Sequence, residues 1–325
     1  MKIKYFISGL LAVLLAIPNI VSAQTYPTKP IKIIVPTTPG GGIDIIARVI
    51  GEKLEKSMGQ PVVIENRPGA STNFGANIVS KADPDGYTLC IVGPGHIVNK
   101  SFYKDISWDP EKSFEPVIYT HSMPMIFAIN KDIPAKTIPE FVAWVKANPG
   151  KAVATTGRGA PQDMSYELFK SYTKVDMIVV PYKGSTAAHP DLIAGRTSLL
   201  IDNAAGVTGH IKAGTLRAIG VSTLHRIKQF PDLPTADEQG LKGFYIVSDG
   251  GILAPAGTPK AIVDKLNAEM NVALKSPDVI ERLMGIGIQP QGGTPEHYAK
   301  VMRADIVKWS KFLKELGIVP GVTPE

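Results

Sequence analysis

The chain has 325 residues, a formal net charge of +6 and 44% hydrophobic residues. Its lysines and arginines are dispersed, without the basic runs or interleaved aromatic residues of a nucleic-acid surface, so no nucleic-acid partner is expected. The mild basic excess favours weak attraction of small anions. A single cysteine permits no disulfide within the chain, so the fold depends on its hydrophobic core, and this length suggests two lobes.

The N-terminus has the pattern of a secretory signal peptide that ends at Ala23. Residues 1–4 carry two lysines, residues 5–17 form an apolar stretch, and residues 21–23 fit a cleavage site. A lipoprotein would need cysteine where Gln24 stands. No later run reaches roughly 18 apolar residues, so we expect a mature periplasmic protein that does not span the membrane.

Apolar, β-branched runs alternate with helical patterns along most of the chain. The runs predict strands at residues 31–35, 62–65, 88–92, 125–129, 152–155, 177–180, 198–201 and 216–221. This alternation predicts an α/β fold with mostly parallel sheets covered by helices, and ligand contacts at the carboxyl ends of the strands. Cys90 lies inside one of these runs and is expected to be a buried thiol.

Three helices are predicted in the last third of the chain. Each begins where a capping residue precedes a proline at the first helical position, at Thr258-Pro259, Ser276-Pro277 and Thr294-Pro295. The last helix is expected to run from Pro295 to Leu316 and to stop at Gly317.

The segment from Ile31 to Asp44 combines a strand, a glycine loop and the start of a helix. Such a junction directs unpaired N–H groups and the positive end of a helix dipole at one point, which suits a carboxylate or a phosphate. A dinucleotide site would need glycine or alanine at Ile45, and a Walker lysine is absent. A plain glycine turn, with Asp44 as a helix cap, is the structural alternative. The candidate ligand contacts are Thr37, Thr38, Gly40, Gly41, Gly42 and Asp44.

Six motifs follow one another in the order typical of one protein family. They are Val35-Pro-Thr-Thr-Pro-Gly-Gly-Gly-Ile-Asp44, Glu65-Asn-Arg-Pro-Gly-Ala70, Asp83-Pro-Asp-Gly-Tyr-Thr-Leu89, Val180-Pro-Tyr-Lys-Gly184, Ile211-Lys-Ala-Gly-Thr-Leu-Arg217 and Leu253-Ala-Pro-Ala-Gly-Thr-Pro259. In these motifs the chain resembles the Bug family, the periplasmic solute receptors of tripartite tricarboxylate transporters. The resemblance spans nearly the whole mature chain.

The resemblance implies a two-lobed, type II-like periplasmic binding protein that closes like a Venus flytrap. Lobe 1 would comprise residues 24–122 and 247–325, and lobe 2 residues 123–246. A small aliphatic or aromatic mono- or dicarboxylate would be held by backbone groups and bridging waters from the strand-one loop of each lobe. The implied partners are a small and a large integral membrane subunit, with no ATP, cofactor or metal, and the receptor is expected to be a monomer.

The loop after the strand at 152–155 mirrors the first loop in the proposed second lobe. Its candidate contacts are Thr156, Gly157, Arg158, Gly159 and Ala160. Arg158 departs from the small polar residues that the family commonly places here. An arginine in the cleft would grip a carboxylate bidentately, and the alternative is a solvated loop arginine.

Further candidates lie at other strand ends. His96 follows the strand at 88–92, although a lone histidine is more often structural. The resemblance puts Tyr182, Asp202 and Asn203 near the cleft, with a supporting or hydroxyl-binding role favoured for Asp202. Ser248 and Asp249 fall where relatives carry an aromatic residue, as does Thr37, so the ligand class stays open between aliphatic dicarboxylates, aromatic carboxylates and amino acids.

A catalytic function is not expected. Ser-x-x-Lys occurs at Ser101–Lys104 and Ser171–Lys174, but about one chance match is expected in such a chain and the companion motifs are missing. Neither a His-Glu-x-x-His nor a Gly-x-Ser-x-Gly motif is present. The alternative to uptake is a sensory protein that signals to a membrane-bound regulator.

Overall fold

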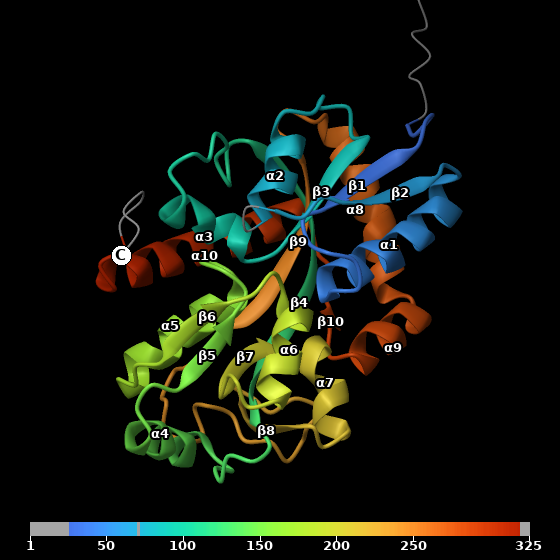
Figure 1. The fold of residues 1–325 in the computed structure, drawn as a ribbon. Coiled ribbons are helices and arrows are strands. Elements are labelled where there is room, and N and C mark those ends of the chain that lie inside the picture. The colour runs from blue at the N-terminus through green and yellow to red at the C-terminus, as the bar shows by residue number, and fades with distance from the viewer. Residues whose placement is uncertain (1–25, 70–71, 319–325) are drawn as a thin grey trace, which may run out of the picture.

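The computed structural model describes residues 26–69 and 72–318, so the expected signal peptide lies outside the described residues. Its strands form a mixed sheet in the order β2-β1-β3-β9-β4-β7-β5-β6, with β8 and β10 paired to β4. Figure 1 shows two halves, one above the other, which are connected through β4 and β9 and covered by helices. The expected α/β architecture is confirmed.

The upper half of Figure 1 is built from both ends of the described chain. Its strands are β1 (Ile31–Val35), β2 (Val62–Asn66), β3 (Thr88–Val92), β9 (Val247–Pro255), β10 (Gln289–Pro290) and the first part of β4 (Phe114–Asn130). Its helices are α1 (Gly42–Met58), α2 (Asn73–Ser80), α3 (Gly95–Phe102), α8 (Lys260–Lys275), α9 (Pro277–Gly285) and α10 (Pro295–Glu315). We call this part the first half.

The second half comes from the middle of the chain. Its strands are β5 (Ala152–Thr155), β6 (Ile178–Pro181), β7 (Leu199–Asn203), β8 (Leu216–Val221) and the last part of β4. Its helices are α4 (Ile138–Ala147), α5 (Pro161–Thr173), α6 (Ser185–Ile193) and α7 (Ala204–Lys212). In each half the outer strands pair in parallel, whereas the pairs made by β4 and β9 are antiparallel.

Strand β4 is the main connection between the halves. Residues 114–124 pair with β9, and residues 125–130 pair with β7 and β8. The sequence predicts only the apolar part, residues 125–129. The earlier part contains Pro116 and polar residues that the structure buries completely, Thr120 and His121, so it does not read as a strand.

Strand β9 also lies outside the sequence prediction, because two glycines interrupt it. A Cβ atom at Gly250 would lie 1.9 Å from the carbonyl oxygen of Val92, and one at Gly251 would lie 2.1 Å from that of Ile118. Glycine allows the neighbouring backbones to approach this closely.

The hydrophobic core is divided between the halves, but α3 and α10 contribute to both. Phe102 of α3 lies in the core cluster of the second half, and His96 of the same helix stacks on Trp108 of the first. Tyr298 and Met302 pack with residues of β3 and β9 in the first half. Trp309 and Leu313, further along the same helix, lie in the core cluster that contains Phe127 of the second half. The last helix therefore packs on both halves.

The helix starts follow the predicted pattern in part. Thr294 caps α10, since its hydroxyl accepts a hydrogen bond from the His297 amide at 3.1 Å, and Gly317 follows the end of the helix at a φ of +73°. The prediction at Thr258 is wrong by one residue, because Pro259 is the cap of α8 and the Thr258 hydroxyl donates to the Pro255 carbonyl. At Ser276-Pro277 the predicted start of α9 is confirmed, because Ser276 is the cap residue and Pro277 the first helical residue, although the Ser276 hydroxyl donates to the Val272 carbonyl and not to the helix.

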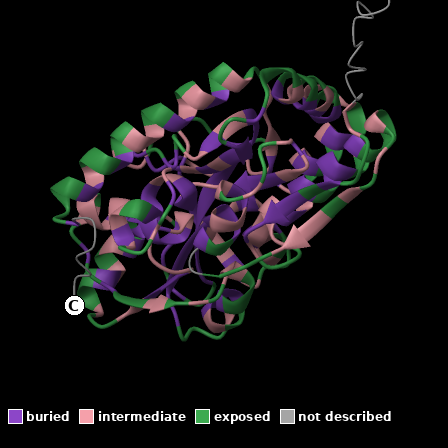
Figure 2. Cartoon of the chain, turned by 90° about the horizontal axis from the view of Figure 1, so that it is seen from above, coloured by how far each residue is buried: buried purple, intermediate pink, exposed green. Residues whose placement is uncertain are grey.

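Burial follows the layered arrangement. Figure 2 shows buried strands inside and helices whose outer faces are exposed. Cys90 is a fully buried free thiol, as predicted. Among the described residues, no helix combines the length and the apolar character that a membrane span requires.

Candidate functional site

The carboxyl ends of the parallel strands of both halves meet at the crossing of β4. A Cβ atom at Gly42, the first residue of α1, would lie 2.8 Å from the sulfur of Met123. Two residues along β4, Met125 pairs with Asn203 at the end of β7. The N-termini of α1 and α7 are therefore close to each other, one from each half, as Figure 1 shows.

The first candidate loop is held in shape by Asp44. Its carboxylate accepts hydrogen bonds from the Gly40 amide at 2.9 Å, from Arg48 at 2.9 and 3.0 Å, and from Asn66 at 2.9 Å. Burial alone would raise the pKa of Asp44, but these bonds lower it below the usual range, so the carboxylate stays ionised. Asp44 thus supports the loop rather than offering a free group to a ligand.

The backbone of the same loop remains available. Gly40 has a φ of +84°, and Gly41 caps α1 without any side-chain hydrogen bond to the helix amides. The Thr37 hydroxyl oxygen is buried and has no hydrogen-bond partner among the described residues, whereas Thr38 is exposed. Open helix amides and an unpaired hydroxyl can both donate to an anion.

The second candidate loop has the same plan. Gly157 and Gly159 have φ values of +101° and +78°, and Ala160 caps α5 without a side-chain hydrogen bond. The Thr156 hydroxyl donates to Gln162 at 2.7 Å. The start of α5 therefore also lacks a side-chain cap, although Pro161, its first residue, has no N–H to donate.

A buried polar network lies beneath this loop and centres on Asp202. Its carboxylate accepts hydrogen bonds from Gln162 at 2.7 Å, Ser185 at 2.8 Å, His189 at 2.9 Å and the Asn203 amide at 2.9 Å. Asn203 in turn caps α7 by accepting from the Gly206 amide. These bonds engage the Asp202 carboxylate with groups of the protein itself.

Gln162, Ser185 and His189 were not among the candidates. Each lies within the first turns of a helix that follows a parallel strand, α5 or α6. The sequence does offer one signal for these residues, because each is polar and lies near the start of a helix that follows a strand. It does not reveal that all three point at one carboxylate.

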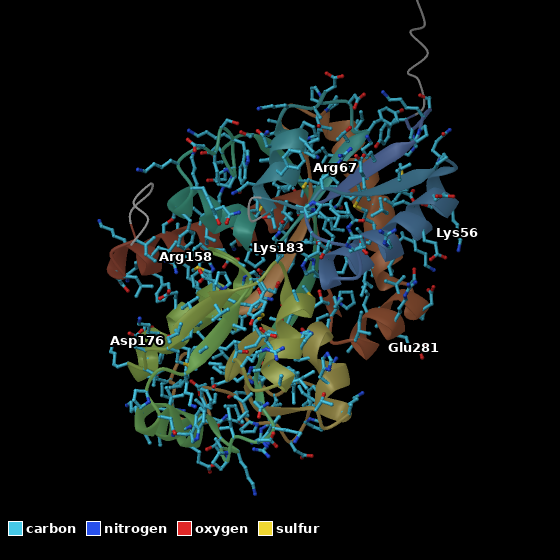
Figure 3. All side chains as sticks on the ribbon, viewed as in Figure 1. Lys56, Arg67, Arg158, Asp176, Lys183 and Glu281 are labelled. Carbon is cyan, nitrogen blue, oxygen red and sulfur yellow. The ribbon has the colours of Figure 1, made fainter. Side chains whose placement is uncertain are left out.

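Arg158 is directed toward the flank of the molecule. Its guanidinium pairs with Glu167 at 3.0 Å and with Asp163 at 3.5 Å, both on α5. It also lies over the ring of Phe102, 5.2 Å from the centroid. Figure 3 shows Arg158 beside α3 and α5, apart from Lys183.

His96 and Tyr182 have structural partners. His96 is buried and stacks on Trp108 with 4.7 Å between ring centroids, and burial lowers its pKa to about 4, so the ring is neutral. The Tyr182 hydroxyl donates to Asp191 at 2.6 Å.

The remaining candidates, Ser248 and Asp249, lie on β9 beside the crossing. Ser248 is buried opposite Met123 of β4. Asp249 accepts a hydrogen bond from Tyr119 at 3.0 Å and lines a water-sized cavity of about 10 Å³ with Asp305 of α10. A second hollow of about 450 Å³, between the starts of α8 and α10, is lined by residues that are remote from both loops in sequence and carries the Arg303–Glu111 ion pair.

Lys183 is a cation near the loops that sequence reasoning did not single out. It is exposed in the turn between β6 and α6, and within the described chain no carboxylate pairs with it. Figure 3 shows Lys183 at the level where the two halves meet. The available signal was the lysine of the Val180–Gly184 motif.

Known proteins resemble the chain over most of its length. A profile of the family described as "Tripartite tricarboxylate transporter family receptor" matches residues 46–318. The protein BugT of Bordetella pertussis is 34% identical over 91% of this chain and 92% of its own. The solved structure of R. palustris Rpa4515 with adipate has a TM-score of 0.86 at 35% identity and covers 91% of this chain and 99% of that one.

Another solved structure, MatC from Rhodopseudomonas palustris with bound malate, has a TM-score of 0.83 at 32% identity and covers 89% of this chain and 100% of that one. The periplasmic binding protein BugD has a TM-score of 0.85 at 32% identity, with 90% and 99% covered. The chain therefore belongs to the receptor family of tripartite tricarboxylate transporters, the TctC or Bug family, which consists of periplasmic binding proteins and not of enzymes.

Proposed function

We propose that this protein captures a small carboxylate between its two halves and delivers it to the membrane subunits of a tripartite tricarboxylate-type transporter. The observation that carries the proposal is that each half offers one helix start without a side-chain cap, that of α1 in the first and that of α5 in the second, with the unpaired Thr37 hydroxyl in the loop before α1. The lobes would be residues 24–122 with 247–325, and residues 123–246, with β4 and β9 as the hinge strands.

Backbone donors can supply the required affinity. A hydrogen bond to a charged group contributes roughly 1.5–3 kcal/mol, and micromolar binding requires about 8 kcal/mol, so about three to five such bonds suffice. The helix dipoles add to this attraction because both helices present their positive ends. Closure of the halves would exclude water and strengthen each bond.

The ligand class that we favour is an aliphatic dicarboxylate. The relatives named above were solved with adipate and with malate, which are both dicarboxylates. In this chain one carboxylate would be held by the two loops. The unpaired ammonium group of Lys183 would meet the second carboxylate.

A thermal-shift screen tests the proposal. Malate, adipate, succinate, benzoate, nicotinate and glutamate would be added at equal ionic strength, with the neutral dimethyl ester of malate as a control. A ligand at 100 times its Kd adds about 2.7 kcal/mol to the free energy of unfolding, so at least one acid should raise the Tm and its ester should not. If no acid shifts the Tm, the proposal is wrong.

Export and delivery need separate measurements. N-terminal sequencing of the protein from the periplasm should begin at Gln24, and its mass in solution should be that of a monomer. Uptake of the best acid should require both the receptor and the membrane subunits. Regulation of transcription without uptake would instead favour a sensory role.

A further inference from the structure

The flank between α3 and the second loop connects the two halves through Arg158. The guanidinium belongs to the second half and lies over the ring of Phe102, in the last turn of α3. Helix α3 follows β3 of the first half, and the Phe102 side chain packs into the core cluster of the second half. The Tyr103 hydroxyl donates to the Arg158 carbonyl at 3.3 Å. A Cβ atom at Gly159 would lie 2.9 Å from the Phe102 ring, so the loop backbone also packs directly on α3.

The orientation of the guanidinium is fixed from its own half. Glu167 and the buried Asp163 accept hydrogen bonds from the guanidinium. Asp163 also accepts a hydrogen bond from the Gly159 amide at 3.0 Å. The guanidinium is held in this way within the distance of a cation–π contact, 5.2 Å from the centroid of the Phe102 ring. To grip a ligand instead, Arg158 would have to leave two carboxylates and the ring.

We propose that Arg158 is a latch: it sets the affinity for the solute by stabilising the closed arrangement of the halves through Phe102, without touching the solute. The inference rests on the proposed function. Apparent affinity scales with the fraction of molecules in the binding-competent arrangement, so a weaker latch raises the Kd of every solute by the same factor. For a partly exposed cation–π contact we expect a factor of about three to ten.

The latch differs from a ligand contact in what it does to different solutes. In Arg158→Ala, calorimetry with malate, adipate and nicotinate should give the same fold increase in Kd for each acid that binds, and stopped-flow measurements should place it in the dissociation rate. Arg226→Ala, which removes an exposed arginine paired with Glu238 within the second half, is the matched control and should leave Kd unchanged.

The partner residue provides an internal check. Phe102→Leu should raise Kd like Arg158→Ala, and the double variant should be no weaker than the more affected single variant, since both remove one contact. Arg158→Lys keeps the charge but loses the planar guanidinium, so it should also weaken binding. Three outcomes would overturn the latch. They are a Kd of Arg158→Lys equal to that of the wild type, effects of the two single variants on Kd that add in the double variant, and a larger increase in Kd for dicarboxylates than for nicotinate.

Scattering without solute separates the latch from the proposed function. The radius of gyration of unliganded Arg158→Ala should exceed that of the wild type and of Arg226→Ala, because fewer molecules are closed. Equal radii in the three proteins would overturn the latch even if every acid binds. Failure of all acids to bind the wild type would instead reject the proposed function, and the scattering result would still decide on the latch.

Discussion

The hydroxyl of Tyr119 donates a hydrogen bond to the carboxylate of Asp249 at 3.0 Å, which joins the two strands that connect the halves. Tyr119 lies on β4 next to a register shift, and Asp249 lies on β9 opposite Ser122. Burial, reinforced by the negative charge of Asp305, raises the pKa of Asp249 to about 7. The charged and titratable groups around this carboxyl are Tyr119, Tyr245, Tyr298, Asp305 and Lys308.

The raised pKa of Asp249 predicts a specific pH dependence of stability. The unfolded chain releases this proton near pH 4, roughly the usual value, whereas the folded protein keeps it until about pH 7. The contribution of Asp249 to the free energy of unfolding therefore falls as the pH rises between these values. Asp249→Asn removes the ionisation, so the Tm of the variant minus that of the wild type should be larger at pH 8 than at pH 5, by a few degrees.

The matched control for this prediction is Asp132→Asn, because the side chain of Asp132 is 74% exposed. Its Tm difference from the wild type should not change with pH in the same range. Thermal unfolding followed by circular dichroism is sufficient. Parallel pH profiles for the wild type and Asp249→Asn would show that the carboxyl titrates at its ordinary pKa.

The fold was predictable from the sequence wherever a strand is an uninterrupted apolar run. The strands Ile31–Val35, Thr88–Val92 and Leu216–Val221 have the predicted bounds. The connecting strands β4 and β9 were not predictable. Their prolines, glycines and buried polar residues make contacts between distant segments, and these contacts leave no local pattern in the sequence. That α10 packs on both halves was likewise not predictable, since an amphipathic helix does not reveal which core its apolar face joins.

The two candidate loops were predictable because glycine loops between a strand and a helix have a local signature. The direction in which a side chain points has no such local signature in the sequence. Arg158 has its partners on α5 and α3, and His96 stacks on Trp108, which the sequence places twelve residues further on. Conversely, the carboxylate of Asp202 accepts hydrogen bonds from three side chains on two helices, α5 and α6, and only the folded chain brings them together.

Gly251 should be intolerant of any side chain. Besides the close Ile118 carbonyl, the ring of Tyr298 would lie 2.6 Å from a Cβ atom there, and neither neighbour is a flexible chain end. Gly251→Ala should therefore lower the free energy of unfolding by about 2 kcal/mol or more, the range of overpacked cores. Urea unfolding measures this change.

Gly209→Ala is the control for that substitution. Gly209 lies within α7 and a Cβ atom there would have no neighbour within 4 Å. Alanine should stabilise this helix by up to about 1 kcal/mol. If both variants change the free energy of unfolding in the same direction, the close packing around Gly251 does not explain why glycine is needed there.

Lys183 should discriminate between solutes by charge. If its ammonium group meets the second carboxylate of a dicarboxylate, Lys183→Gln should raise the Kd of malate or adipate about tenfold, the effect of one lost hydrogen bond to a charged group. A monocarboxylate such as nicotinate should lose at most twofold. Lys146→Gln, an exposed lysine on α4, is the control, and calorimetry is the measurement. Equal losses of affinity for dicarboxylates and monocarboxylates would show that Lys183 does not contact the second carboxylate.

Thr37 offers a test in which stability and affinity change in opposite directions. Its buried hydroxyl oxygen lacks a partner among the described residues, so Thr37→Val should leave the unliganded protein as stable as the wild type or slightly more stable. If the hydroxyl donates to the bound carboxylate, the same substitution should raise the Kd at least about fivefold, because the solute loses a charge-assisted hydrogen bond.

Thr197 is the matched control because its hydroxyl is also buried and unpaired within the described residues, but it precedes β7, at the opposite end of the strand from Asn203. Thr197→Val should therefore reproduce the effect on stability and leave the Kd unchanged. The comparison separates the effect of a buried hydroxyl on stability from its contact with the solute, since both variants remove an unpaired, buried hydroxyl. A Kd unchanged in Thr37→Val would mean that the first loop binds through its backbone amides alone, or that the solute lies elsewhere.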